Sequence, residues 1–105
     1  QERAAKEINK VEELFTEIAK NNLAVYGLKE TEDASSIGAV KELLVTDSFI
    51  QKSRSENFYN QVDRIMKTVE KTKGEVDIIS SEHDAGKKLD GLGGIAAILR
   101  FKMSY

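Results

Sequence analysis

The segment GLGGIAAILRF, residues 91–101, decides how the rest of the chain is interpreted. Three glycines lead into a run of aliphatic side chains, and a short aliphatic run bounded by glycine is typical of a buried strand. We therefore predict a strand over residues 95–101. A buried strand does not require a charged side chain, so Arg100, near the end of the run, needs a separate explanation.

Helices and strands alternate along the chain that precedes this segment. Apolar residues spaced by three and four predict a first helix from Ala4 to about Asn21. These residues are Ile8, Val11, Phe15 and Ile18. Glycines and short apolar runs mark the other elements. The predicted helices cover residues 4–21, 29–38, 53–74 and 82–92, and the predicted strands cover residues 23–27, 41–47, 75–80 and 95–101.

Fourfold alternation of helix and strand favours a largely parallel sheet, because each connection between parallel strands must cross a face of the sheet. The expected fold class is α/β, a three-layer α/β/α sandwich. At 105 residues the chain fits one domain. It opens on QERAAKEINK without methionine, so we expect residues 1–105 to be one domain cut from a longer multidomain protein.

Composition excludes several classes of protein. The chain has no cysteine, which excludes disulfides and thiolate metal sites. Its formal net charge is −2, so no large positive field attracts nucleic acid or anionic lipid. The sequence has no apolar run long enough to span a membrane. We expect a cytoplasmic protein with no membrane partner.

The helix predicted over residues 53–74 has the clearest amphipathic pattern. Ser53 and Glu56 have the capping-box spacing at its start. Arg64, Lys67 and Lys71 lie along one side of it and could face phosphates. Asp63 and Glu70 interrupt that row. A solvated helix face is therefore the favoured interpretation, and direct RNA binding by this domain is not expected.

Catalytic and cofactor chemistry find little support in the sequence. His83, the only histidine, lies in the first turn of a predicted helix that Ser81 and Asp84 would cap. No further soft or imidazole ligand accompanies it, so a structural or surface role is favoured over a metal or catalytic one. The glycines at positions 91–94 follow a helix and precede a strand, the reverse of a phosphate-binding loop. We expect no enzyme, no cofactor and no metal.

Two long segments carry a resemblance to a known family. They are AVYGLKETEDASSIGAVKELLVTD, residues 24–47, and EVDIISSEHDAGKKLDGLGGIAAILRF, residues 75–101. Both closely resemble the C-terminal domain of the archaeal Pelota family of ribosome-rescue factors, which is related to the class-one termination factors. The resemblance implies the fold of release-factor domain three, which is shared with ribosomal proteins that bind kink-turn RNA.

The resemblance also implies a function. Pelota proteins enter stalled ribosomes with a translational GTPase, elongation factor one alpha in archaea, and act with the ABC-type recycling ATPase in ribosome rescue, mRNA surveillance and no-go decay. The implied role for this domain is non-catalytic protein binding, with the stalled ribosome contacted through the full-length protein. The implied partner-binding residues are Ala97, Ile98, Leu99, Arg100 and Phe101.

Two alternatives remain open from the residues themselves. Arg100 either contacts a partner or pairs internally with an acid such as Asp77 or Asp90. The domain could also bind kink-turn RNA through GLKETED, residues 27–33. That second alternative is disfavoured, because Lys29 stands where the RNA-binding relatives have asparagine and acids adjoin it.

Overall fold

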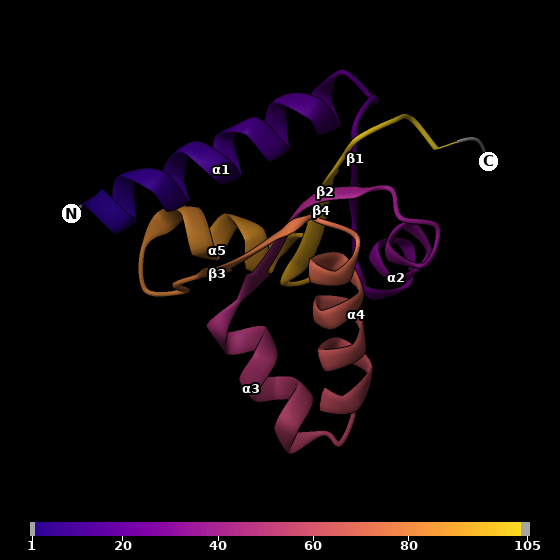
Figure 1. The fold of residues 1–105 in the computed structure, drawn as a ribbon. Helices are drawn as coiled ribbons and strands as arrows, with labels where there is room; N and C mark the ends of the chain where they lie inside the picture. Colours follow the sequence, from indigo (N-terminus) through magenta and orange to yellow (C-terminus); the bar gives the residue numbers. More distant parts are fainter. Residues whose placement is uncertain (1, 104–105) are drawn as a thin grey trace.

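The structure is a computed structural model that describes residues 2–103. It contains helices and strands in strict alternation, apart from two consecutive helices in the middle (Figure 1). In chain order the elements are α1 (Glu2–Ala19), β1 (Ala24–Tyr26), α2 (Leu28–Ser36), β2 (Val40–Thr46), α3 (Asp47–Ser55), α4 (Tyr59–Lys71), β3 (Glu75–Ile79), α5 (Asp84–Gly91) and β4 (Ile95–Leu99).

The four described strands form one sheet with the order β1-β4-β2-β3. Only β2 and β3 are parallel, whereas β4 runs antiparallel to both of its neighbours. The expectation of a largely parallel sheet is therefore wrong. The chain leaves β3 through the eight-residue α5 and comes back along the sheet in the opposite direction to β3. Strand β4 starts beside the end of β2, where Thr46 N–H donates to Gly94 O at 2.9 Å.

Helices cover both faces of the sheet (Figure 1). One core cluster joins α1 and α5 to the sheet through residues such as Leu14, Leu44 and Leu89. The other joins α2, α3 and α4 to the opposite face through residues such as Leu43, Phe49 and Ile65. The three-layer α/β/α sandwich expected from the sequence is confirmed.

Helix α3 was not expected from the sequence. It is capped by Thr46, whose side chain accepts a hydrogen bond from Phe49 N–H at 3.0 Å. The residue predicted to cap the following helix, Ser53, is instead buried inside α3 and donates to Ile50 O. Helix α4 therefore begins only at Tyr59. The predicted capping box over residues 53–56 is wrong, because two helices replace the one that was expected.

The start of α5 also differs from its predicted form. The N-cap is His83, whose Nδ1 accepts from Gly86 N–H at 3.4 Å. Its Nε2 lies 2.7 Å from Glu7 Oε1 on α1, so the ring links two helices. The structural role favoured for His83 is confirmed. Because the buried face of α1 includes Glu7, the predicted stripe is rotated and Ile8 is 40% exposed.

Glu7 gives a first prediction about stability. Burial raises the pKa of this carboxyl, but hydrogen bonds from Ser80 N–H, His83 and Arg3 outweigh burial, so its pKa is lowered. The stabilisation is therefore complete above the unfolded pKa and is lost as pH falls through the folded pKa. We expect Glu7→Gln to reduce the free energy of unfolding by about 1–2 kcal/mol at about pH 7.

The loss caused by Glu7→Gln should shrink as both proteins are acidified to about pH 3, because the wild-type carboxyl is then protonated as well. Urea unfolding at a series of pH values measures it. Glu12→Gln, an exposed change in the same helix, is the control. A loss that does not depend on pH would contradict a role for the charge of Glu7.

Candidate partner-binding site at the end of β4

The predicted site residues divide into a buried part and an exposed part. Strand β4 lies inside the sheet, and Ala97, Ile98 and Leu99 are at most 2% exposed. These three side chains cannot touch a partner while the domain is folded. They instead hold the end of the strand in place, and Arg100 and Phe101 emerge from that end into solvent.

Arg100 is fixed by its own chain although its side chain is exposed. Its backbone N–H donates to Ala39 O at 2.8 Å. Its guanidinium donates to Gly38 O at 3.4 Å and also to Thr72 O. Within the described chain the internal partners of Arg100 are therefore backbone carbonyls.

Neither of the acids considered from the sequence pairs with this guanidinium in the described residues. Asp90 accepts hydrogen bonds from Thr46 and Ser48. Asp77 lies on β3, where the charge acting most strongly on it is that of Lys10. The internal ion pair that was one alternative for Arg100 is absent from residues 2–103, and backbone carbonyls hold the guanidinium instead.

Two helix C-termini explain why carbonyl groups gather around Arg100. At the end of α2, Gly38 has φ 71° and Ala39 N–H donates back to Ala34 O. At the end of α4, Lys73 has φ 72° and Gly74 N–H donates back to Val69 O. Both helices thus end in the Schellman arrangement. A cation at these ends is favourable, because helix C-termini carry partial negative charge.

Two exposed apolar residues adjoin, in sequence, Arg100 and the Gly38 carbonyl that it contacts. Phe101, the next residue, is 48% exposed. Ile37, which precedes the Gly38 carbonyl, is 57% exposed. We call Ile37, Arg100 and Phe101 the docking face. Large apolar side chains beside an arginine are the usual anchors of protein interfaces. Sequence reasoning missed Ile37, although an isoleucine in the polar run ETEDASSIG was a visible signal.

The kink-turn alternative centres on the start of α2. Gly27 precedes the helix with φ 88°, and Lys29 lies in its first turn. The ammonium of Lys29 is 3.2 Å from the carboxylate of Asp33. An acid therefore adjoins the lysine that would have to meet phosphate, which is unfavourable for RNA.

Comparisons with known proteins identify the family of this chain. The family model described as eRF1 domain 3 matches residues 4–103. The chain therefore belongs to the eRF1 domain 3 family. Within that family it corresponds to the C-terminal domain of archaeal Pelota. The kink-turn alternative is not favoured by these findings.

Three relatives show the extent of the similarity. The Pelota homolog of Pyrococcus furiosus is 46% identical over 101 residues, which are 96% of this chain and 27% of the relative. A structure of ribosome-bound archaeal Pelota and ABCE1 is 44% identical with a TM-score of 0.83, covering 99% of this chain and 28% of that one. Dom34 of S. cerevisiae, a translation termination-like factor interacting with Hbs1, is 33% identical with a TM-score of 0.87. The match covers 94% of this chain and 28% of Dom34.

The chain thus spans about a quarter of the length of the curated relatives that it matches. Within the described residues, no helix is both long and apolar enough to cross a membrane.

Proposed function

We propose that this chain is a non-catalytic docking domain of a ribosome-rescue factor and that it binds a translational GTPase through the docking face. The observation that carries the proposal is that Arg100 is exposed yet held by the carbonyls of Gly38 and Thr72, next in sequence to exposed Phe101 and bonded beside exposed Ile37. A side chain that is already ordered loses little entropy on binding, so a planar fork of donors held in this way favours a specific partner.

Arg100 has two tasks in this proposal. Its bonds to Gly38 O and Thr72 O hold the ends of α2 and α4 beside the end of β4. Its remaining N–H donors face solvent and are available to a carboxylate or carbonyl of the partner. Phe101 and Ile37 supply the apolar area that a stable contact requires.

The relatives support the choice of partners. Dom34 is described as interacting with Hbs1, and an archaeal Pelota is seen on the ribosome with ABCE1. By this analogy the full-length protein would carry the domain, through its other parts, into stalled ribosomes in the cytoplasm. Elongation factor one alpha would be the GTPase, the ABC-type recycling ATPase a second partner, and mRNA surveillance the process served.

Phe101→Ala tests the docking face most directly. In the full-length protein we expect it to weaken binding of elongation factor one alpha in its GTP form by at least about tenfold, because a buried aromatic anchor is typically worth that much. Isothermal titration calorimetry measures the change. Arg100→Lys should also weaken binding, because it keeps the charge but loses the planar fork.

Tyr26→Ala is the matched control. Tyr26 and Phe101 are both 48% exposed aromatic residues, but Tyr26 pairs with Ala96, near the opposite end of β4. We expect this variant to bind the GTPase as the wild type does. Equal affinities for wild type and Phe101→Ala would refute the assignment of the docking face.

A further inference from the structure

Positive charge is concentrated in one part of this acidic chain. Residues 50–74 contain six basic residues (Lys and Arg) and three acidic ones (Asp and Glu). The rest of the chain contains ten basic and fifteen acidic residues. This segment forms most of α3 and the whole of α4. A net positive segment in a chain of net charge −2 indicates a local electrostatic surface, which the overall charge conceals.

The positive charge of α4 lies along its outermost row of side chains. Positions spaced by four, three and four share one helix face. In α4 they are Asn60, Arg64, Lys67 and Lys71, all exposed. We call these four residues the α4 crest. The buried residues Val62, Ile65 and Val69 lie on the opposite side of the helix, so the crest is the part of α4 farthest from the core.

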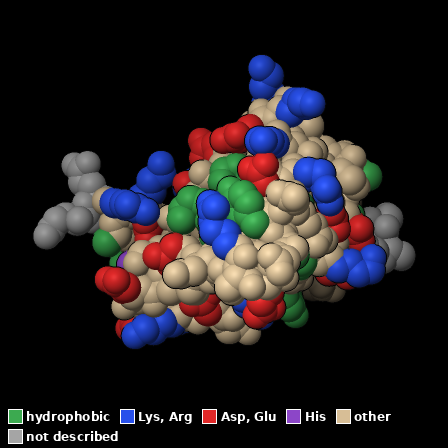
Figure 2. All heavy atoms as spheres, turned by 90° about the horizontal axis from the view of Figure 1, so that it is seen from below, with side chains coloured by type: hydrophobic (Ala, Val, Ile, Leu, Met, Phe, Trp, Pro, Cys, Tyr) green, Lys and Arg blue, Asp and Glu red, His purple; other side chains and the backbone are tan. Residues whose placement is uncertain are grey.

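The acids of α4 lie beside the crest and not on it. By helix periodicity Asp63 and Glu70 occupy one flank, whereas the other flank carries the neutral Gln61 and Thr68. Asp63 pairs with Lys67 at 2.9 Å and so offsets part of one charge. Figure 2, which views the molecule from below Figure 1, shows Lys and Arg side chains interleaved with Asp and Glu side chains on that face. The excess of positive charge therefore belongs to the crest.

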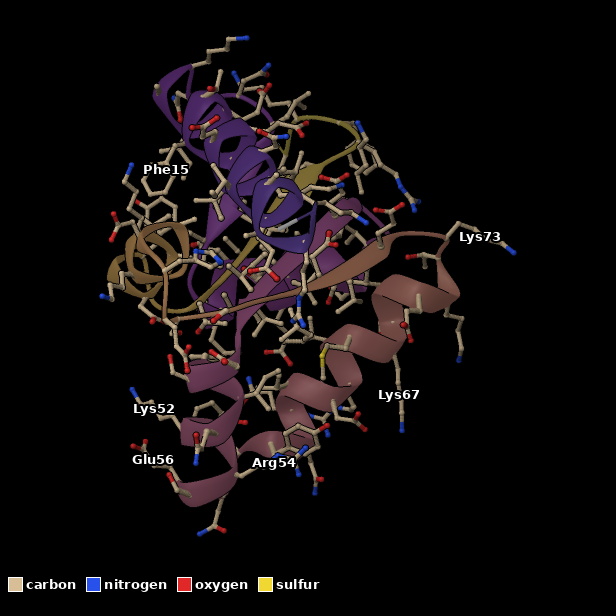
Figure 3. The ribbon with its side chains drawn as sticks, turned by 90° about the vertical axis from the view of Figure 1, so that its left-hand side faces the viewer. Phe15, Lys52, Arg54, Glu56, Lys67 and Lys73 are labelled. Carbon is tan, nitrogen blue, oxygen red and sulfur yellow. The ribbon has the colours of Figure 1, made fainter. Side chains whose placement is uncertain are left out.

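The N-terminal end of the crest offers a second group of donors. The guanidinium of Arg54 lies 4.0 Å from the ring centroid of Tyr59, and with Asn57 and Asn60 these residues line a shallow hollow. Helix α4 starts there without a side-chain cap or an acid in its first turn. Figure 3 shows Arg54 at this end and Lys67 and Lys73 projecting from the helix and its C-terminal end, whereas Lys52 and Glu56 lie along α3.

We propose that the α4 crest binds the sugar-phosphate backbone of RNA. Cations in a row along a helix match a regular array of phosphates, and a stacked arginine and tyrosine with amides at one end can contact riboses and bases. The crest is a convex ridge, which suits the shallow minor groove of an RNA duplex and not an extended acidic peptide, which needs a groove. The proposal does not depend on GTPase docking.

The test is binding of a fluorescent RNA duplex of about 16 base pairs, long enough to span such a face. The crest variant carries Arg64→Gln, Lys67→Gln and Lys71→Gln. The matched control carries Lys20→Gln, Lys87→Gln and Lys88→Gln, which lie in or beside the helices on the other face of the sheet and change the net charge equally. Anisotropy titrations of the 105-residue chain at several salt concentrations give the affinity and its salt dependence.

We expect the crest variant to bind RNA at least about tenfold more weakly and to lose about three units of the salt slope, one for each phosphate contact. The control should retain wild-type affinity, and circular dichroism should show that both variants are folded. Equal losses in the two variants, no binding by wild type, or equally effective competition by polyglutamate would each overturn the proposal.

Discussion

Replacing Gly86 by alanine is expected to destabilise the domain by about 3 kcal/mol or more, the largest effect that we expect from a single methyl group here. Gly86 lies in the first turn of α5 and is buried against the end of β3. A Cβ atom at this position would lie 1.8 Å from Ser80 O and 2.8 Å from Ser81 Cα. These are backbone atoms, so no rotamer change relieves the clash.

The helix would therefore have to move away from the strand. Such a movement breaks the hydrogen bond from Gly86 N–H to His83 and displaces Leu89, which is fully buried in the core beneath α1. Urea unfolding monitored by circular dichroism measures the loss as a lower midpoint. Because His83 also contacts Glu7, α1 should lose support as well.

Gly91→Ala is the matched control for this prediction. Gly91 is the last residue of the same helix, and a Cβ atom there would have no heavy atom within 4 Å. We expect a stability within about 0.5 kcal/mol of wild type, or slightly above it, because alanine restricts the unfolded chain. Equal stabilities for Gly86→Ala and Gly91→Ala would show that close approach does not limit the packing of α5.

The elements with a local signal were predictable from the sequence. The aliphatic run at residues 95–99 forms β4, and the repeating apolar positions of α4 place Val62, Ile65 and Val69 in the core. Strand direction was not predictable. Alternation of helix and strand does not show whether a connecting helix brings the chain back to the edge of the sheet where the previous strand began, which would make the two strands parallel. The contact of Thr46 with Gly94 places the start of β4 beside the end of β2, and it exists only in the assembled sheet.

Helix α3 shows a second limit of local patterns. Its nine residues include only two large apolar side chains, Phe49 and Ile50, so its periodicity is weak. The ring of Phe49 packs against that of Phe58, with centroids 5.7 Å apart, and belongs to the core beneath α2 and α4. Tertiary packing therefore stabilises a helix that its own sequence barely indicates.

The environment of Arg100 was beyond sequence reasoning for a related reason. An isolated arginine after an aliphatic run indicates a special role, and an acid is the partner that sequence suggests first. The structure brings the carbonyls of Gly38 and Thr72 to it, from positions 62 and 28 residues away. Backbone carbonyls carry no residue-type signal, so no pattern of side chains could identify them.

A cluster of charges beneath α1 leads to the second large effect. Lys10 Nζ on α1 contacts Glu42 on β2 and lies 3.4 Å from Glu75 Oε1 on β3. One oxygen of Glu42 and one of Asp77 are buried without a hydrogen-bond partner among the described residues. The ammonium is therefore the main compensation for several carboxylates that the sheet holds partly out of water.

This cluster raises the pKa values of both Lys10 and Asp77. Burial lowers the pKa of Lys10, but the hydrogen bond and charge of Glu42 outweigh it, so the pKa is raised. Its stabilisation is complete below the unfolded pKa and is lost as pH rises through the folded pKa. Burial, assisted by Glu42 and Glu75, raises the pKa of Asp77, so its penalty exists above the folded pKa and is relieved as pH falls through it.

Lys10→Met is expected to reduce the free energy of unfolding by about 2–3 kcal/mol at about pH 7, because removing one partner leaves the carboxylates uncompensated. This loss is smaller than that for breaking a fully buried ion pair, because the side chains of Lys10 and Glu42 are 17% and 11% exposed and water screens part of their interaction. Urea unfolding measures it. Lys20→Met, an exposed change just after the same helix, should stay within about 0.5 kcal/mol of wild type.

Asp77→Asn provides the decisive comparison for this cluster. Alone it should stabilise the domain near neutral pH, because it removes a carboxylate whose charged form burial disfavours. In the Lys10→Met background it should stabilise the domain by more than it does alone, because the carboxylate it removes has there lost the ammonium that compensates it, so the two substitutions should be non-additive. Additive effects in the double-mutant cycle, or a Lys10→Met protein as stable as Lys20→Met, would show that Lys10 does not compensate these acids.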